Sequence, residues 1–238
     1  MRWNWKESQI CAYCGVFGPV EKEHVIGKQF FPSEGTFRGD LIIVPSCNEC
    51  NRKKGQIEDM VVAFLPFSDG GVASKTVIET HLMKMFPKNK RLLEKFREAF
   101  QEDFYRDRNG KFARRVVIRL DTEMLNSFLR WVKYVVRGTY REFKGENIPS
   151  DHRISVTYLS EPNSSNFLEQ WVTGLRGAKV GTLANGEFKY KYALGVDGII
   201  SSAWIFAIYN FKIFATTHNV KDSSVLENIE KTFWKELY

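Results

Sequence analysis

The chain has 238 residues, 43% hydrophobic and 26% charged, a balance that excludes wholesale disorder and allows one large or two small folded domains. Its formal net charge of +7 suits a polyanionic partner such as nucleic acid, because lysine and arginine release counterions when they neutralise phosphates. The chain lacks both a long apolar run and an apolar signal-peptide core. We therefore expect a cytoplasmic protein with no membrane partner and with reduced cysteines.

All four cysteines precede Asn51, and they form two Cys-x-x-Cys pairs, Cys11 with Cys14 and Cys47 with Cys50. Two residues between partners allow both thiolates to face one ion, and two such pairs complete a tetrahedron, which selects zinc or iron. A thioredoxin-like redox motif or a chance pairing is the alternative. Because nothing else in the chain suggests redox work, we predict a structural zinc ion whose binding contributes on the order of 10 kcal/mol or more to folding.

The segment between the two cysteine pairs predicts two strands, and the segment after them predicts a helix. Val25 and Ile26 would end a first strand that carries His24, and the short β-branched run 41–45 is typical of a second strand. After the second pair, apolar residues follow helical spacing up to Pro66. These residues are Ile57, Val61, Phe64 and Leu65.

This combination of motifs resembles the zinc-binding HNH endonucleases, which have a ββα-metal (treble-clef-like) fold. The match covers about residues 9 to 66 and rests on Cys11, Cys14, Glu23, His24, Cys47, Cys50, Asn51 and Lys54. The resemblance implies that His24 is the general base. It also implies that Glu23 and Asn51 are the acidic and amide ligands of a catalytic Mg²⁺ or Mn²⁺ ion.

These residue types suit phosphodiester hydrolysis. An imidazole with an ordinary pKa of about 6.5 can take a proton from water near neutral pH. A hard divalent ion held by one carboxylate and one amide keeps open positions for a phosphate and for water. Glu23 and His24 are adjacent, so their side chains diverge on an extended segment, and one can hold the metal while the other faces the water. The alternatives are a surface histidine at His24 and a helix-capping residue at Asn51.

Two features depart from the family pattern. The middle Asn of the motif has no clear equivalent, and Asp40, just before the second predicted strand, is the nearest candidate. Gly27 stands where relatives often have Pro. Basic residues near the motif are candidate nucleic-acid contacts, although a solvated helix face is the alternative for those after the second cysteine pair. The candidates are Lys28, Arg52, Lys53 and Lys54.

The chain is predicted to be an α+β protein with three segments: an HNH module over 1–68, a helical connector over 69–110, and an α+β domain over 111–238 with a partly antiparallel sheet. The connector should hold two short helices within 74–105, interrupted by Pro87. The last segment should contain strands at 112–120, 153–159, 187–194, 199–209 and 212–217, and helices from Asp121 or Thr122, over 166–175 and from about Ser223.

We find no second catalytic constellation in residues 111–238, and we interpret His81, His152 and His218 as structural or exposed. This domain is expected to recognise the substrate or a partner. The favoured function is a metal-dependent endonuclease acting on DNA, with a role in restriction or phage defence by family analogy. The alternatives are a non-catalytic zinc-dependent nucleic-acid-binding protein and a nuclease subunit of a larger defence complex. A homodimer, a partner protein and RNA as substrate stay open.

Overall fold

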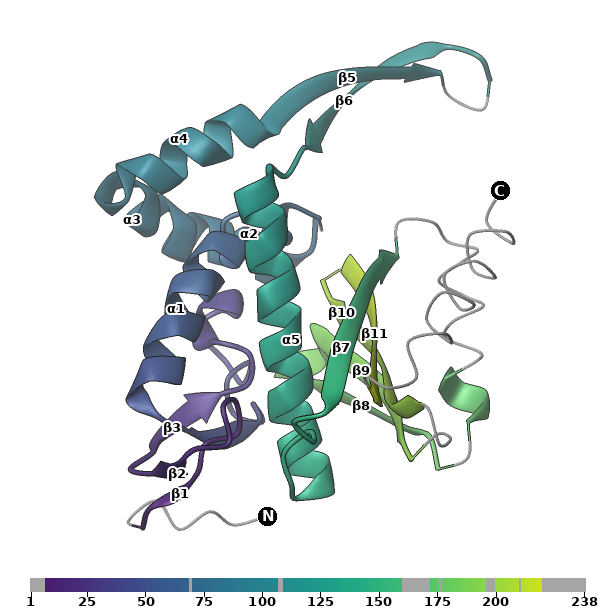
Figure 1. Cartoon of the computed structure of the whole chain (residues 1–238). Coiled ribbons are helices and arrows are strands. Elements are labelled where there is room, and N and C mark those ends of the chain that lie inside the picture. Colours follow the sequence, from purple (N-terminus) through teal and green to yellow (C-terminus); the bar gives the residue numbers. More distant parts are fainter. Residues whose placement is uncertain are drawn as a thin grey trace.

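The long helix α5 (Thr122–Lys144) stands at the centre of the molecule, with a cysteine-containing region on one side and an antiparallel sheet on the other (Figure 1). The computed structural model describes residues 7–68, 70–106, 109–159, 172–175, 177–195, 200–209 and 211–219. The fold is a mixture of helix and sheet, as the α+β prediction requires. Within these described residues, no helix has the length and apolar character needed to cross a membrane.

The N-terminal region contains two small antiparallel strand pairs and one helix. The elements are β1 (Gln9–Ile10), β2 (Phe17–Gly18), β3 (Glu21–His24), β4 (Ile43–Ser46) and α1 (Asn48–Val62). Strand β3 pairs with β4, so that Glu23 lies opposite Val44 and His24 opposite Ile43. The predicted order of strand, strand and helix is confirmed. The helix begins earlier than expected, which places Cys50 and Asn51 in its first turn.

The predicted helical connector is helical as far as Ala99. A 3-10 turn (Leu65–Ser68) precedes it. Its elements are α2 (Val72–Val77), a π-helical turn (Ile78–Leu82), α3 (Met83–Met85), a 3-10 turn (Phe86–Lys88) and α4 (Lys90–Ala99). The prediction of helix up to residue 105 is wrong, because residues 100–106 form strand β5. This strand pairs with β6 (Phe112–Ile118). Aromatic residues favour a strand once a neighbouring strand supplies backbone partners, and that partner is not visible in the local pattern.

The C-terminal half forms one five-stranded sheet in the order β7-β11-β10-β9-β8. The strands are β7 (His152–Leu159), β8 (Lys179–Leu183), β9 (Phe188–Leu194), β10 (Ile200–Ile208) and β11 (Phe211–Asn219). Every pairing is antiparallel, so the expectation of a partly antiparallel sheet is corrected to a wholly antiparallel one. Strand β8 was not predicted. Of the helix predicted over 166–175, only residues 172–175 are described, and 172–174 form a helical turn. The helix predicted from about Ser223 lies outside the described residues.

Helix α5 joins the two halves through its apolar face. Asp121 caps the helix by accepting a 2.7 Å hydrogen bond from the Met124 backbone N–H, as the sequence predicts. One apolar core includes Phe30 from the first predicted segment, Leu92 from the second and Trp204 from the third. The proposed domain boundaries stay a prediction, and the three segments share this core.

Candidate metal centre and neighbouring polar site

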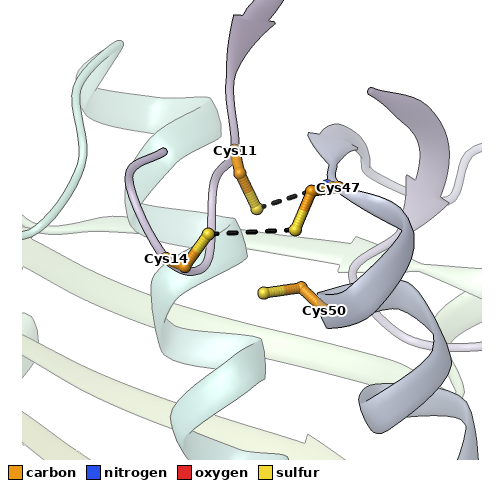
Figure 2. Close-up of side chains that lie close together, drawn as sticks. All are labelled: Cys11, Cys14, Cys47 and Cys50. Carbon is orange, nitrogen blue, oxygen red and sulfur yellow. Dashed lines mark hydrogen bonds between the residues drawn. The ribbon is translucent and has the colours of Figure 1, made fainter. Parts of the chain in front are cut away.

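The four cysteine side chains converge from a turn after β1 and from the start of α1 (Figure 2). Their sulfur atoms all lie within 4.8 Å of one another, and the Cys14 and Cys47 sulfurs are 3.8 Å apart. Tetrahedral zinc with Zn–S bonds of about 2.3 Å places its sulfur ligands about 3.8 Å from one another. The predicted grouping is confirmed, and these cysteines could hold a metal ion such as zinc.

Backbone hydrogen bonds shape the cysteine cluster. The Gly15 N–H donates to the Cys11 carbonyl at 3.0 Å, and the positive φ of Gly15 (78°) closes the turn of the first pair. The Cys47 N–H donates to the Cys11 sulfur at 3.4 Å. Burial alone would raise the pKa of the Cys11 thiol, but backbone N–H groups of Cys47, Cys14 and Tyr13 outweigh it and lower that pKa to about 7. Burial raises the pKa of the Cys14 and Cys50 thiols, so of these three cysteines Cys11 is the one that loses its proton most readily near neutral pH.

A buried ion network connects α1 to the end of β3. The Lys54 ammonium donates to Glu23 Oε1 and to Glu58 Oε1, both at 2.6 Å, and to the His24 carbonyl at 2.8 Å. The Lys54 side chain is 0% exposed. Full burial removes Lys54 from the predicted phosphate contacts and makes it a link within the fold. The other predicted contacts, Lys28, Arg52 and Lys53, are exposed.

The same network explains the glycine at position 27. The Gly27 N–H donates to Glu58 Oε1 at 2.9 Å, and a proline there would lack this donor. A Cβ atom at Gly27 would lie 2.4 Å from Glu58 Oε2. Glycine at position 27 therefore leaves the space that the Glu58 carboxylate fills and supplies the N–H that this carboxylate binds.

The structure brings Asn51 to a different carboxylate from the one predicted. Asn51 Nδ2 donates to Glu21 Oε2 at 2.9 Å, whereas Glu23 binds Lys54. Side chains two apart on a strand share a face, so Glu21 and Glu23 both meet α1. Sequence reasoning missed Glu21, although its position two residues before Glu23 was the available signal. The acidic and amide groups therefore lie on facing elements, with Glu21 as the direct partner of Asn51.

His24 is held as a neutral imidazole. Burial, together with the positive charges of Lys28, Lys54 and Arg38, lowers the pKa of His24 to about 4. Alternation along β3 places its side chain on the face opposite to that of Glu23. The divergence expected from adjacent residues is thus present. A pKa this far below neutral keeps the imidazole unprotonated and makes it a weaker base than an ordinary histidine.

Asp40, the candidate for the middle Asn of the motif, contacts the C-terminal half. Its Oδ1 atom accepts a 2.9 Å hydrogen bond from the Ala184 backbone N–H. Nearby, the Thr36 hydroxyl donates to Asn185 Oδ1 at 2.8 Å. These bonds fix the loop between β3 and β4 against the turn that follows β8, so Asp40 orients this loop.

A Ser-His-Asp arrangement that the sequence analysis did not find lies at one corner of the large sheet. His152 Nδ1 is 2.9 Å from Asp151 Oδ1, and His152 Nε2 is 2.5 Å from the Ser201 hydroxyl. Asn219 Nδ2 donates to Asp151 Oδ2 at 2.9 Å. His152 also lines a cavity of about 220 Å³, whereas Ser201 is not among the described residues that line it. We therefore interpret these bonds as ties between β7, β10 and β11.

Comparison of the chain with protein-family models, with curated proteins and with solved structures found no match. The resemblance to the HNH endonucleases therefore rests on the eight motif residues. Any function assigned to the chain depends on the geometry of the groups around β3 and α1.

Proposed function

We propose that the chain is a metal-dependent endonuclease of the HNH type that hydrolyses phosphodiester bonds in DNA. The observation that supports this most is the placement of the Glu21 and Glu23 carboxylates on the face of β3 that meets the Asn51 amide and Lys54 of α1, with His24 the next residue along the strand. Glu21, Glu23 and His24 lie between the two cysteine pairs and Asn51 directly follows the second, which is the order expected of a ββα-metal module. The basic net charge of +7 suits a DNA substrate.

Two kinds of metal site follow from the two donor sets. The four cysteine sulfurs would bind zinc with all positions filled by protein, which is the arrangement of a structural site. The oxygen donors Glu23 and Asn51, with Glu21 alongside, suit a hard ion such as Mg²⁺ or Mn²⁺. Bound there, such an ion would neutralise charge on the scissile phosphate.

The protein groups supply the proton transfer and the positioning. The His24 imidazole would accept a proton from the attacking water as the water oxygen bonds to phosphorus and the bond to the leaving oxygen breaks. Lys54 binds both the His24 carbonyl and the Glu23 carboxylate, so it holds these neighbours in a fixed relation to α1. Lys28 and Arg38, which act electrostatically on His24, would favour an anionic phosphate near the imidazole. DNA cleavage of this kind would suit restriction or phage defence, by family analogy.

The test is nicking of supercoiled plasmid with Mg²⁺ or Mn²⁺. His24→Ala should reduce the rate by about 100-fold or more, the usual contribution of a general base. His152→Ala is the matched control, because it removes a histidine from the sheet corner and should leave the rate unchanged. Thermal unfolding of both variants checks that they fold. Equal cleavage by wild type and His24→Ala would exclude His24 from the chemistry.

A second candidate is a non-catalytic zinc-dependent nucleic-acid-binding protein. Two observations favour it: Lys54 already binds Glu23, and the His24 side chain lies on the face of β3 opposite to the one that meets Asn51. This candidate predicts DNA binding by the wild type without cleavage under Mg²⁺, Mn²⁺, Co²⁺ or Ni²⁺. Cleavage with any of these ions that depends on His24 would exclude it.

A further inference from the structure

A two-stranded arm, formed by β5 and β6 (residues 100–106 and 112–118), projects from the end of α4 (Figure 1). The two strands pair only with each other among the described strands. At about 3.3 Å per residue, seven residues reach roughly 23 Å. Only the base of the arm is packed into the body: the Phe100 ring lies 4.3 Å from that of Phe96 and 5.2 Å from that of Phe67.

Beyond its base, one face of the arm exposes large apolar side chains. The register places Phe104 opposite Arg114 and Arg106 opposite Phe112, and side chains two apart share a face. Phe104 is 66% exposed, Phe112 74% and Val116 60%. Large apolar side chains gathered on one exposed face mark an interaction surface in a folded protein.

Guanidinium groups are interleaved with these rings on the same face. The Arg106 guanidinium carbon lies 4.7 Å from the centroid of the Phe112 ring, and Arg114 pairs with Glu102. The sequence of the described arm and its turn has four basic residues against two acidic ones. These are Arg106, Lys111, Arg114 and Arg115 against Glu102 and Asp103. The face that carries the rings has Arg106 and Arg114 against Glu102, so it is aromatic with a small excess of positive charge, and the arm as a whole also has more basic than acidic residues.

This chemistry distinguishes the classes of partner. Aromatic residues and arginine are enriched at protein–protein interfaces as well as on nucleic-acid-binding surfaces, whereas lysine is depleted at the centres of protein–protein interfaces. Proteins that bind nucleic acid combine cations for the phosphates with exposed aromatic rings that contact or wedge between bases. A two-stranded β-ribbon also has the width of the major groove of duplex DNA. Charge and shape both favour DNA over a second protein.

We propose that the arm of β5 and β6 is a DNA-binding ribbon that enters a groove of the duplex. Arg106 and Lys111 would contact phosphates near the tip, and Phe104 and Phe112 would contact the bases or sugars. The choice of DNA rests on the proposed nuclease function. The arm would then hold the substrate, while the groups around β3 and α1 carry out the cleavage.

The experiment measures binding of the full chain to a short fluorescent DNA duplex by anisotropy, without added Mg²⁺ or Mn²⁺ and with the His24→Ala substitution in every protein. Arg106→Ala with Lys111→Ala should weaken binding about tenfold and lower the slope of log affinity against log salt by about 2, one counterion being released per contact. Phe104→Ala with Phe112→Ala should weaken binding about tenfold or more and leave that slope unchanged. The matched control, Lys179→Ala with Val180→Ala, removes a cation and a 65% exposed apolar residue from the sheet edge. It should bind like the parent.

The remaining outcomes separate a failure of the arm proposal from a failure of the proposed nuclease function. Equal DNA affinity of the arm variants and the control overturns the arm proposal, and so does the absence of any DNA binding. Sedimentation that shows a dimer, converted to a monomer by the phenylalanine substitutions with DNA affinity unchanged, assigns the arm to self-association instead. Binding through the arm by a wild type that cleaves nothing removes the nuclease function alone. Cleavage that is insensitive to the arm substitutions removes the arm proposal alone.

Discussion

The cysteine-containing region and the large sheet keep their shapes by different means. In the first, short strands of two to four residues are connected by the cysteine cluster and by the buried Lys54 network. In the sheet, aromatic rings stack onto α5: the Tyr192 ring lies 4.6 Å from Phe143 and 4.9 Å from Trp204. Apolar burial is spread over many atoms, whereas ligand and ion contacts depend on single groups. Single substitutions should therefore be more damaging in the N-terminal region than in the sheet.

The largest expected effect is that of Cys47→Ser. Loss of one ligand removes most of a binding free energy on the order of 10 kcal/mol and should unfold residues 7–68 locally. Metal content and hydrogen exchange followed by mass spectrometry measure both changes. In the sheet, Ile208→Val removes one buried methylene and should cost about 0.5–1.5 kcal/mol with full retention of metal. Unchanged exchange protection in Cys47→Ser would show that the cluster does not determine this region's stability.

The next largest effect is a difference in the free energy of unfolding between substitutions of two adjacent lysines in α1, Lys54 and Lys53. Lys54→Met leaves the buried carboxylates Glu23 and Glu58 without a counter-charge and should lower the free energy of unfolding by about 3–5 kcal/mol. Lys53 forms an exposed pair with Glu49 that water screens, so Lys53→Met should cost far less than Lys54→Met. Urea unfolding of both variants gives the difference. Similar small losses would mean that the network is dispensable.

Two helical glycines should respond with opposite signs. A Cβ at Gly138 in α5 would lie 2.6 Å from Val25 Cγ2, so Gly138→Ala should cost about 1–3 kcal/mol where α5 packs on the end of the β3 strand. At Gly55 in α1, a Cβ meets nothing within 4 Å, so Gly55→Ala should stabilise by up to about 1 kcal/mol. Chemical unfolding measures both. A Gly138→Ala variant as stable as wild type would show that the α5 contact tolerates expansion.

The smallest expected effect is a change in how the melting temperature depends on pH, caused by His218 in strand β11 of the large sheet. His218 is buried, and its pKa is lowered by burial and by the positive charges of Arg153 and His152. The unfolded chain, with a pKa of about 6.5, takes up a proton that the folded chain resists, so stability is lost as the pH falls below about 6.5. The melting temperature should fall less steeply between about pH 7 and pH 5 in His218→Gln than in wild type. Identical slopes would place the pH dependence elsewhere.

Local patterns were enough to predict the cysteine cluster and most of the fold. Ligand spacing identifies a metal site because both partners of a pair lie in one turn, and apolar periodicity identified α5 together with the cap at Asp121. Strand β5 was wrongly predicted as helix because the choice between helix and strand there depends on its pairing with β6, which the local pattern does not contain. Strand β8 has no clear alternation and contains Gly181, so its only signal is the neighbouring β9.

The polar site could be predicted only in part, for a related reason. Which carboxylate meets Asn51 depends on how α1 lies across β3, and no local pattern contains that angle. The spacing of Asn51, Lys54 and Glu58 does place them on one helix face, which is a signal that these groups act together. Ser201 and His152 lie on strands that β11 separates in the sheet. No local sequence pattern contains the strand order that brings these two side chains into contact.

The most direct test of the nuclease site is an anomalous difference map from crystals of the wild-type protein soaked in Mn²⁺. The account predicts one manganese peak between β3 and α1, bound by Glu23 and Asn51 with the His24 ring beside it, while zinc occupies the four cysteines. A map with no manganese between these elements, with Glu23 still bound to Lys54 and His24 turned away, would contradict it.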